Sequence, residues 1–528
     1  MPLIMRFLVL IALSFFLYKR QKRYLRYLQQ EDYDAFRFLK WVKNASAFDT
    51  RGTLIALVGW ILSLIIENAA SVFLIFGYTT LALFEKNPEH YGKKHFVKTA
   101  RARRVLLTAV IFHTVLVLPI ILWASHVMVS LGCIAACQTA PLFLACSVFL
   151  LSNDEKRRQK KLLAKAHRRL LEVNPYVIGI TGSYGKTTTK HFLSKLLNMT
   201  LGPAYHPNKG INTPMGITRD IQTHLRDRTS YAVIEMAAYG PGSISALCQL
   251  TPPQGAILTT IGLAHLERFG SQDIIRKTKA ELAQSVPNNG FLILNGDDAH
   301  CRGIGRDYPK QTVLYYGFDE TLGHLDLKIS LKSIDEKGSE LKLKYGGHVY
   351  ECKVPIYGKP LLSNLGASFL TACHLGADPT YAASSLTHLD PVDNRLHIQT
   401  ENNITYIHDA YNSNPSGFEA ALKVLQEFPG KRRILMTPGM VELGQLQESE
   451  NERVVSLAHG VDVALIIGKT NRFSLERGLL KSGLLKKDLY FLPTRDEAFI
   501  LLKTLKRAGD IILIENDLPD LYEMKERF

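Results

Sequence analysis

The run YVIGITGSYGKTTTKHFLSKLL, residues 176–197, constrains the fold of this chain more than any other segment. Its apolar start, Tyr176 to Ile180, predicts a buried strand, and the amphipathic stretch that begins near Lys186 predicts a helix. The turn between them is rich in glycine. Glycines let backbone amides approach phosphate oxygens, and the amino end of a helix adds partial positive charge. The segment therefore predicts a strand–loop–helix cradle for the phosphates of a nucleotide.

Two side chains at the start of this helix have the chemistry that a bound nucleotide needs. Lys186 is expected to reach the β- and γ-phosphates, and Thr187 to hold Mg²⁺ through its hydroxyl group. The common phosphate-loop pattern places four residues between its first glycine and the Gly-Lys pair, whereas five separate Gly179 from Gly185. The shorter pattern G-S-Y-G-K-T-T fits a related loop. We therefore expect ATP and Mg²⁺ as cofactors.

Three stretches near the amino terminus are almost free of charge, namely residues 3–18, 53–84 and 105–151. Each approaches or exceeds the length that a helix needs to cross a bilayer. If the two longer blocks each cross twice, with turns near residues 67–68 and 123–130, the chain has five transmembrane helices. Four is the alternative, because each half of residues 53–84 offers only about 15 residues, roughly 23 Å of helix. Buried helices of a soluble protein are the competing interpretation.

The basic excess of the chain belongs to the same region. Residues 1–174 contain 25 Lys and Arg against 10 Asp and Glu, so they carry +15 of the formal net charge of +16. Basic loops beside apolar spans stay on the cytoplasmic side. Because the charge flanks the apolar stretches and has no interleaved aromatic residues at a folded site, it indicates membrane lipid as a partner and argues against nucleic acid.

From Pro175 onward, strand-like and helical stretches alternate. This alternation predicts an α/β fold with largely parallel sheets that are covered on both faces. Residues 325–356 alternate with period two around a Gly-Gly turn, which predicts an antiparallel insert. A second boundary falls near residues 390–396. We expect four parts in order: a membrane region at 1–151, a basic cytoplasmic linker at 152–174, an ATP-binding central domain at 175–394 and a C-terminal domain at 395–528.

Three further side chains stand where a site is expected. Glu235 ends an apolar strand before a glycine-rich loop, where α/β enzymes hold Mg²⁺, although a surface glutamate gives the same local pattern. His265 follows the strand-like run ILTTIG, and a lone histidine is more often structural than functional. Lys279 lies on a predicted helix, where composition alone favours a solvated face. Local sequence therefore leaves these three assignments open.

Seven motifs along the chain, taken together, resemble those of the Mur ligases: GITGSYGKTTT, EMAAYGPGSI, IGLAHLERFGS, KTKAE, LNGDD, DNRL and DAYNSNP. The resemblance covers about residues 175–520. It implies a P-loop central domain of the Mur-ligase type, followed by a Rossmann-like C-terminal domain. It also implies an ATP-dependent ligase, in which a carboxylate takes the γ-phosphate and an amine, either an amino acid or a dipeptide, attacks the acyl phosphate.

The resemblance implies roles for the residues of the central domain. Thr187 and Glu235 would hold one Mg²⁺, and His265 would help to hold a second. Lys279 matches a lysine that family members carbamylate. The nucleotide phosphates would lie on the loop residues Gly182, Ser183, Tyr184, Gly185, Lys186, Thr187 and Thr188.

Further roles follow for the region between the two domains and for the C-terminal domain. By resemblance, Arg395 would reach the γ-phosphate from the hinge, and Asp409 would bind the ribose. Asn364 would lie near the adenine. Asn412 and Asn414 share the loop after Asp409 and would line the site where the domains close. Lys186, His265, Lys279 and Arg395 form the expected catalytic set.

The chain also departs from the family pattern. Ser363 and Ala367 stand where members have a histidine and a second asparagine around Asn364. Near the end, Glu515 to Asp520 replace a basic K-G-S-R segment. Membrane spans and a basic linker stand in the place of the domain that grips a UDP-sugar. The first departure leaves the adenine contacts open, and the second indicates a different acid or amine substrate. The third points away from a soluble UDP-linked substrate.

We therefore expect a ligase anchored in the bacterial cytoplasmic (inner) membrane, with its ligase domains in the cytoplasm. Its substrate would be a small-molecule or lipid-linked carboxylate, used in cell-wall or envelope peptide synthesis. One alternative is the ligase that adds D-alanyl-D-alanine to UDP-muramoyl-tripeptide, and another is a poly-γ-glutamate-type polymerase. The last alternative is a non-catalytic, nucleotide-binding membrane regulator.

Overall fold

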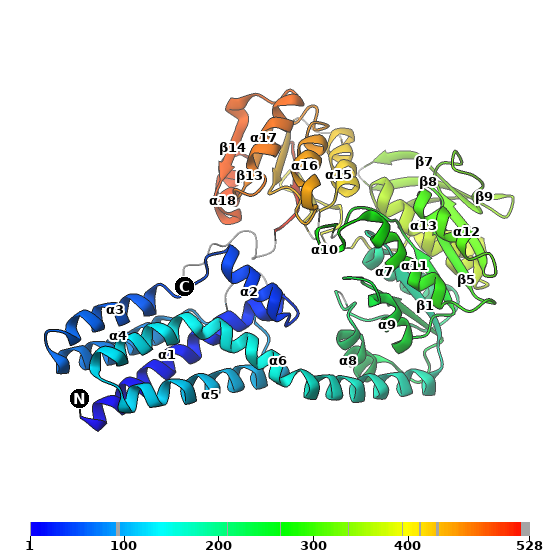
Figure 1. Cartoon of the computed structure of the whole chain (residues 1–528). Coiled ribbons are helices and arrows are strands. Elements are labelled where there is room, and N and C mark those ends of the chain that lie inside the picture. Colours follow the sequence, from blue (N-terminus) through cyan, green and yellow to red (C-terminus); the bar gives the residue numbers. More distant parts are fainter. Residues whose placement is uncertain are drawn as a thin grey trace. The chain divides into compact units, whose positions relative to one another are not determined.

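The computed structural model describes residues 2–90, 96–208, 210–264, 266–335, 337–392, 394–410, 413–428 and 432–518 (Figure 1). Two compact units divide the chain, one within Met1–Gln159 and the other over Lys160–Leu518. The first unit is helical, and the second contains two β-sheets with their covering helices.

The first unit is a bundle of helices around an apolar core. In it α1 packs against α4 and α5, and α3 packs against α4. The core combines aromatic and small aliphatic side chains, among them Phe16, Tyr78 and Ala109. The helices are α1 (Leu3–Gln30), α2 (Ala35–Asn44), α3 (Arg51–Ser63), α4 (Glu67–Phe84), α5 (Ala100–Trp123) and α6 (His126–Val173).

The helix bounds refine the expected spans. The apolar stretch at 3–18 is the first part of a longer helix, because α1 continues through the basic run that follows it. The chain turns at residues 64–66, just before the expected position, and again between Trp123 and His126. The basic linker at 152–174 is helical, since α6 continues without interruption to Val173. A helical linker keeps its backbone hydrogen bonds satisfied along its whole length.

Among the described residues, two helices are long and apolar enough to cross a membrane by length and composition, α5 and the stretch Val127–Val173 of α6. The helix α3 and the stretch Asn68–Phe84 of α4 are apolar but shorter. The four- and five-span topologies both stay predictions.

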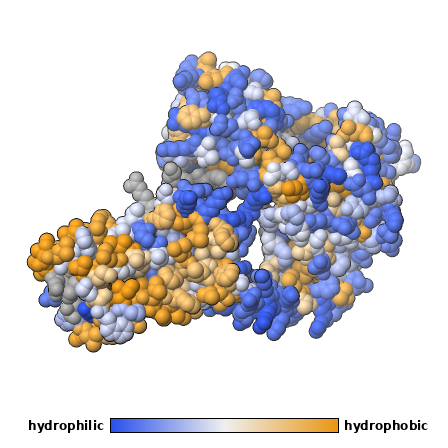
Figure 2. Space-filling model, viewed as in Figure 1, coloured by the Kyte–Doolittle hydropathy of each residue, from blue (hydrophilic) through white to orange (hydrophobic). Residues whose placement is uncertain are grey.

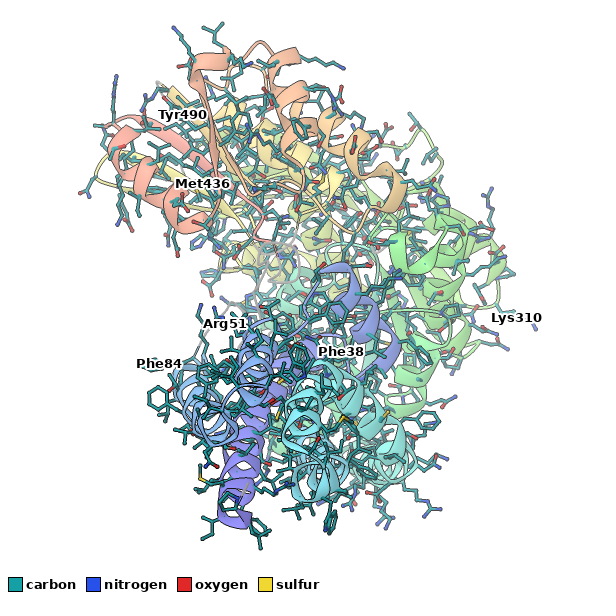
Figure 3. The ribbon with its side chains drawn as sticks, turned by 60° about the vertical axis from the view of Figure 1, so that its left-hand side comes forward. Phe38, Arg51, Phe84, Lys310, Met436 and Tyr490 are labelled. Carbon is teal, nitrogen blue, oxygen red and sulfur yellow. The ribbon has the colours of Figure 1, made fainter. Side chains whose placement is uncertain are left out.

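Large apolar side chains are exposed mainly on the helical unit. Of those described as exposed, 31 lie within residues 3–150 and 14 in the rest of the chain, although the helical unit is less than a third of its length. Figure 2 shows them as a nearly continuous apolar surface. Phe84 at the end of α4 is 82% exposed and projects outward, whereas Phe38 of α2 is buried (Figure 3). An exposed apolar surface of this kind indicates contact with a membrane or a protein.

The helical unit also buries charged side chains, and it pairs them. Arg20 of α1 lies 3.0 Å from Asp49, which precedes α3, and both side chains are fully buried. Arg20 and Arg23 both approach Glu85 at the end of α4, at 3.4 and 3.0 Å. Three segments that are distant in sequence therefore meet at one cluster of opposite charges.

The second unit begins with a nine-stranded sheet of order β2-β3-β1-β4-β5-β6-β7-β8-β9. Its strands are parallel from β2 to β7, and β7–β8–β9 form antiparallel pairs, at the place of the expected insert. The strands are β1 (Tyr176–Thr181), β2 (Ala204–Tyr205), β3 (Tyr231–Glu235), β4 (Gly255–Leu258), β5 (Phe291–Asn295), β6 (Thr312–Gly317), β7 (Leu327–Asp335), β8 (Gly338–Tyr345) and β9 (His348–Val354).

Helices cover both faces of this sheet, as a mostly parallel sheet requires. One core includes Phe192, Leu365 and Phe369, which come from the helices α7 and α13. The core on the other face includes Ile221, Leu282 and side chains of the last turns of α6. The helices are α7 (Lys186–Thr200), α8 (Pro214–His224), α9 (Ser243–Leu250), α10 (Leu266–Phe269), α11 (Gln272–Ser285), α12 (Ala299–Asp307), α13 (Lys359–His374) and α14 (Pro379–Leu386).

The C-terminal sheet has the order β10-β11-β15-β12-β13-β14. Only β10 runs antiparallel to its neighbour. Its strands are β10 (His397–Glu401), β11 (Ile404–Asp409), β12 (Arg432–Thr437), β13 (Val463–Ile467), β14 (Leu489–Leu492) and β15 (Asp510–Glu515). Its helices are α15 (Pro415–Glu427), η1 (Gly444–Leu446), α16 (Gln447–Val455), α17 (Arg472–Lys481), η2 (Lys486–Asp488) and α18 (Arg495–Leu505). The strand ends of β11, β15 and β12 share one edge, where open α/β sheets bind ligands.

Candidate active site

The phosphate loop lies between β1 and α7, as the sequence predicts. Gly182 and Gly185 have φ angles of +152° and +82°, which favour glycine. A Cβ atom at Gly182 would collide with the Thr259 hydroxyl, and one at Gly185 would collide with the Asn364 amide. The two glycines are therefore required both by the backbone conformation and by close neighbours.

Hydrogen bonds hold this loop against the segment after β4. The Ser183 amide donates to the Thr260 carbonyl at 2.7 Å, and the Ser183 hydroxyl bonds both backbone groups of Gly262 at 2.9 and 3.0 Å. The Thr259 hydroxyl donates to the Tyr184 carbonyl. Gly185 precedes α7 without a capping side chain. The amides of the first helical turn therefore remain suited to an anion such as phosphate.

Lys186 folds back over the loop. Its ammonium donates to the carbonyls of Gly182 at 2.8 Å and Ser183 at 3.2 Å. Burial lowers the pKa of Lys186, and the negative charge of Glu235 partly opposes that shift. Thr188, the residue after Thr187, is buried in the first turn of α7.

Glu235, at the end of β3, is the centre of a buried polar cluster. The Thr187 hydroxyl donates to its Oε2 at 2.9 Å, and the Asn212 amide donates to its Oε1 at 3.0 Å. The ammonium of Lys190 lies 3.4 Å from Oε2 and donates to the Pro207 carbonyl at 3.0 Å. The structure therefore brings together the two residues that the sequence assigns to Mg²⁺.

The oxygen donors of Thr187 and Glu235 fit Mg²⁺ in kind. Mg²⁺ is bound through one or two carboxylates together with phosphate oxygens and waters, rather than by an all-protein cage. Within the described residues, no group of three or more His, Cys, Asp or Glu side chains gathers. His265 and Asn412 lie outside the described residues.

Lys279 lies on α11 and is 5% exposed. Burial lowers its pKa well below the usual lysine value, and the positive charge of Lys186 lowers it further. Burial of this kind favours the neutral amine over the charged ammonium. Its neighbour in the same motif, Glu281, has a structural role, because its carboxylate accepts three backbone N–H groups at the start of α9.

The other expected residues lie on α13 and around the hinge. Asn364 is buried on α13 beside Gly185. Arg395 stands between Asn394 and Leu396, which both have positive φ angles, +54° and +44°. Such a conformation is costly for a residue like leucine, and strained backbone of this kind clusters at functional sites. The Leu396 amide donates to Asp409 at 3.3 Å, and burial raises the pKa of Asp409 to about 6.

Sequence reasoning missed Lys190 and Asn212 as partners of Glu235. Lys190 follows Lys186 by one helical turn, a spacing that could have placed both on the same face of α7. Asn212 lies on an irregular segment before α8 and carries no local signal. Glu515 entered the sequence reasoning only as a departure from the family, yet it is fully buried and adjoins Asp409.

A phosphate loop with a lysine, a threonine and a strand-end carboxylate, in a chain with a second parallel-sheet domain, defines a nucleotide-using α/β enzyme. Comparison with known families is more specific. The Mur ligase middle domain matches residues 180–372, and the Mur ligase, glutamate ligase domain matches residues 394–515. The chain belongs to the Mur ligase family, and it is an ATP-dependent acid–amino-acid ligase.

Similar proteins agree with this assignment. The UDP-N-acetylmuramoyl-tripeptide–D-alanyl-D-alanine ligases of Mycobacterium tuberculosis and Bacillus subtilis are each 30% identical to the chain. The matches cover 67% and 69% of this chain and 73% and 77% of those proteins. The crystal structure of MurF ligase from Thermotoga maritima in complex with ADP is 25% identical, with a TM-score of 0.59, over 70% of this chain and 82% of that one. Family and relatives support the expected binding of ATP.

Proposed function

We propose that the chain is a membrane-anchored ligase that activates a carboxylate as an acyl phosphate and joins it to an amine. The observation that carries the chemistry is the contact between the Thr187 hydroxyl and the Glu235 carboxylate beside the phosphate loop. A metal held there would neutralise charge on the transferred phosphoryl group.

The reaction has two steps. A carboxylate oxygen of the substrate attacks the γ-phosphorus, the bond to the bridging oxygen breaks, and ADP leaves. A neutral amine then attacks the acyl carbon, and inorganic phosphate leaves with the electron pair of the broken C–O bond and can take the proton that the nitrogen loses. Catalysis of this kind depends on positioning and on neutralising charge.

We assign the phosphates to the loop and to the first turn of α7. Lys186 would contact the β- and γ-phosphates, and Thr187 with Glu235 would bind Mg²⁺. Lys190 and Asn212 would orient the Glu235 carboxylate, since each contacts one of its oxygens. The loop residues concerned are Gly182, Ser183, Tyr184, Gly185 and Thr188 together with Lys186 and Thr187.

For Lys279 we propose carbamylation. A carbamate forms when a neutral amine adds to carbon dioxide, and burial beside Lys186 favours the neutral amine. The product is anionic, so it would place an opposite charge beside the Lys186 ammonium. It would then serve, with His265, as a ligand of a second Mg²⁺.

The second domain would complete the nucleotide site. We propose that Arg395 reaches the γ-phosphate and that Asp409 accepts a hydrogen bond from the ribose. Asn364, buried beside the phosphate loop, would contact the adenine side. Asn414 caps α15 through a hydrogen bond to the Gly417 amide, so we give it a structural role rather than a place in the lining of the site.

Membrane attachment is supported by the helical unit. It combines two helices long enough to span, an exposed apolar surface and a strongly basic composition. Basic segments next to spans favour the cytoplasmic side. We propose that the helical unit, residues 1–151, anchors the chain in the inner membrane, and that 175–394 and 395–528 form the cytoplasmic ligase domains.

The substrate proposal follows from the same unit. The curated relatives named above act on UDP-N-acetylmuramoyl-tripeptide and D-alanyl-D-alanine. In this chain the family match begins only at residue 180, after the helical unit. We propose a carboxylate that is lipid-linked or otherwise held at the membrane, within cell-wall or envelope peptide synthesis. The UDP-linked reaction is the second candidate, favoured by the 30% identity to those ligases.

The function is tested by mass spectrometry of the products formed by the full-length protein in detergent or nanodiscs. Pairs of acid and amine are supplied with ATP, and Lys186→Ala serves as the inactive control. A single mass increment with equal release of ADP and phosphate is the expected result. A ladder of products would instead indicate a poly-γ-glutamate-type polymerase. Nucleotide binding without amine-dependent turnover would indicate a regulator and contradict the proposal.

Membrane attachment is tested by extraction of membranes from expressing cells. The protein should resist both high salt and alkaline carbonate and should dissolve only in detergent, because apolar spans do not depend on charge. Release by high salt alone would contradict a spanning anchor.

A further inference from the structure

Two acidic side chains end neighbouring parallel strands of the C-terminal sheet. Asp409 closes β11 and Glu515 closes β15, and the strand register pairs these two residues directly. Neighbouring strands lie about 4.8 Å apart, and side chains at paired positions project from the same face. The two carboxyl groups therefore lie side by side at the edge where such sheets bind ligands.

Glu515 is fully buried, and only one of its carboxyl oxygens is satisfied. The Ser413 hydroxyl donates to Oε1 at 2.5 Å, whereas Oε2 is buried and has no hydrogen-bond partner in the described part of the chain. A buried carboxylate oxygen without a donor is costly. A protonated carboxyl group can itself donate a hydrogen bond. The pair is therefore suited to hold one shared proton.

Burial and repulsion act in the same direction on this pair. Burial raises the pKa of Glu515 well above its usual value, and the neighbouring Asp409 charge raises it further. Burial also raises the pKa of Asp409 to about 6. Arg395 opposes the shift on both carboxyls by lowering each pKa. Two carboxylates at this separation resist ionising together.

The other charged groups near the pair are engaged elsewhere. Asp517 forms an ion pair with Arg495. His408, next to Asp409 on β11, has its pKa lowered by burial and by the charges of His397 and Arg495. Of the charged side chains in the described ranges, Arg395 is thus the one that acts on both carboxyls.

We propose that Glu515 is a nucleotide-positioning residue that keeps one proton on the Asp409–Glu515 pair. Asp409 can then accept a hydrogen bond from the ribose, and no second negative charge lies beside the phosphates. This inference rests on the proposed function, which assigns the ribose to Asp409. Loss of the shared proton adds a charge that repels a bound nucleotide. Nucleotide affinity therefore falls as the pair loses its proton, whereas a Glu515 that served only in packing would give no such pH response.

The test is a titration of ADP onto the full-length protein in detergent, carried from about pH 7 upward in steps until the wild type unfolds, because the phosphates of ADP stay ionised throughout. The Kd of the wild type should rise about tenfold across this range, because one charge is added near the phosphates. Glu515→Gln carries a neutral amide of the same shape. Its Kd should equal that of the wild type near pH 7.5 and rise less steeply at higher pH, where the rise that remains comes from other groups such as Lys186, whose pKa is lowered by burial.

A second variant keeps the proposal testable if Glu515→Gln does not fold. Ser413 stabilises the ionised form of Glu515, so Ser413→Ala should shift the loss of affinity to higher pH. The proposal is overturned if Glu515→Gln loses affinity with pH as the wild type does, or if Ser413→Ala leaves the pH profile unchanged. Loss of amide ligation with an intact, pH-dependent ADP affinity would overturn the proposed function alone. Absence of ADP binding at every pH would overturn both.

Discussion

Both units of this chain bury pairs of opposite charge, and the ligase unit also buries groups whose pKa is shifted by a like charge. In the helical unit, Arg20 and Asp49 are fully buried as a pair of opposite charges. In the ligase unit, Lys190 and Glu235 form such a pair at 3.4 Å. Burial lowers the pKa of Lys279 and raises that of Glu515, and the like charges of Lys186 and Asp409 add to these two shifts.

The two kinds of buried charge serve different purposes, one structural and one chemical. Opposite charges compensate each other without a ligand, so such a cluster can hold helices together in an apolar unit. Like charges in a buried place cost free energy until a ligand, a proton or a covalent change compensates them. In the proposed site, phosphates and a carbamate would compensate the charges of Lys186 and Lys279. A shared proton would compensate those of Asp409 and Glu515. Each prediction below tests one side of this contrast.

The largest effect is expected at Lys186. Lys186→Ala removes the cation at the phosphate loop and should lower kcat/KM for ATP-dependent ligation by about 10³-fold or more. Lys195→Ala, on the same helix but in an exposed ion pair with Asp390, is the matched control and should retain activity. The measurement is coupled ADP release with both substrates present. Equal activity of the two variants would contradict the proposed role of Lys186 in binding the phosphates.

The next effect concerns the stability of the helical unit. Asp49→Ala removes one carboxylate from the buried cluster around Arg20, leaves an excess of buried positive charge and should destabilise the bundle by about 3–5 kcal/mol. Unfolding in detergent, followed by tryptophan fluorescence, measures it, because Trp41, Trp60 and Trp123 all lie in the helical unit. Asp154→Ala removes an exposed pair with Arg158 and should leave stability unchanged. A large loss in the Asp154 variant, or none in the Asp49 variant, would contradict the structural role of the buried cluster.

A smaller effect is expected at Lys279. Lys279→Ala should lower kcat by about 10²-fold, because a metal ligand and its charge are lost. Removing carbon dioxide and bicarbonate from the buffer should reduce wild-type activity in the same direction, and adding bicarbonate should restore it. Lys277→Ala, exposed on the same helix, is the control. A wild type that is indifferent to carbon dioxide would exclude carbamylation.

The smallest effect is a pH dependence of stability at Asp409. Because its pKa is raised to about 6 in the folded protein, the folded state binds more protons than the unfolded state between about pH 4 and 6. Stability contributed by this group therefore falls as pH rises through that window. Asp409→Asn should remove a decline on the order of 1 kcal/mol. Chemical denaturation at two pH values measures it, and an unchanged slope in Asp409→Asn would contradict the shift.

Much of the fold could be predicted from the sequence because its signals are local. Consecutive residues predict the phosphate loop, and the alternation of strands and helices predicts the parallel sheets. The antiparallel insert has its own period and turn, and it forms β7, β8 and β9. The sequence made no prediction for the secondary structure of the linker, through which α6 continues to Val173.

The residues of the site also fall into two groups, those that local sequence could predict and those that it could not. Lys186, Thr187 and Glu235 could be proposed because each follows a strand or opens a helix. Lys190 and Asn212 could not, because their contacts with Glu235 depend on how α7 and the segment before α8 pack beside β3.

By itself, the sequence determined the family, the nucleotide loop and the presence of a basic, apolar amino-terminal region, because each of these features depends on short runs of neighbouring residues. Only the tertiary structure decided which buried charges meet. Asp409 and Glu515 are about a hundred residues apart and become neighbours through the register of β11 and β15. Charges interact through space, and the distances that set their energies are fixed by packing and strand register rather than by position along the chain.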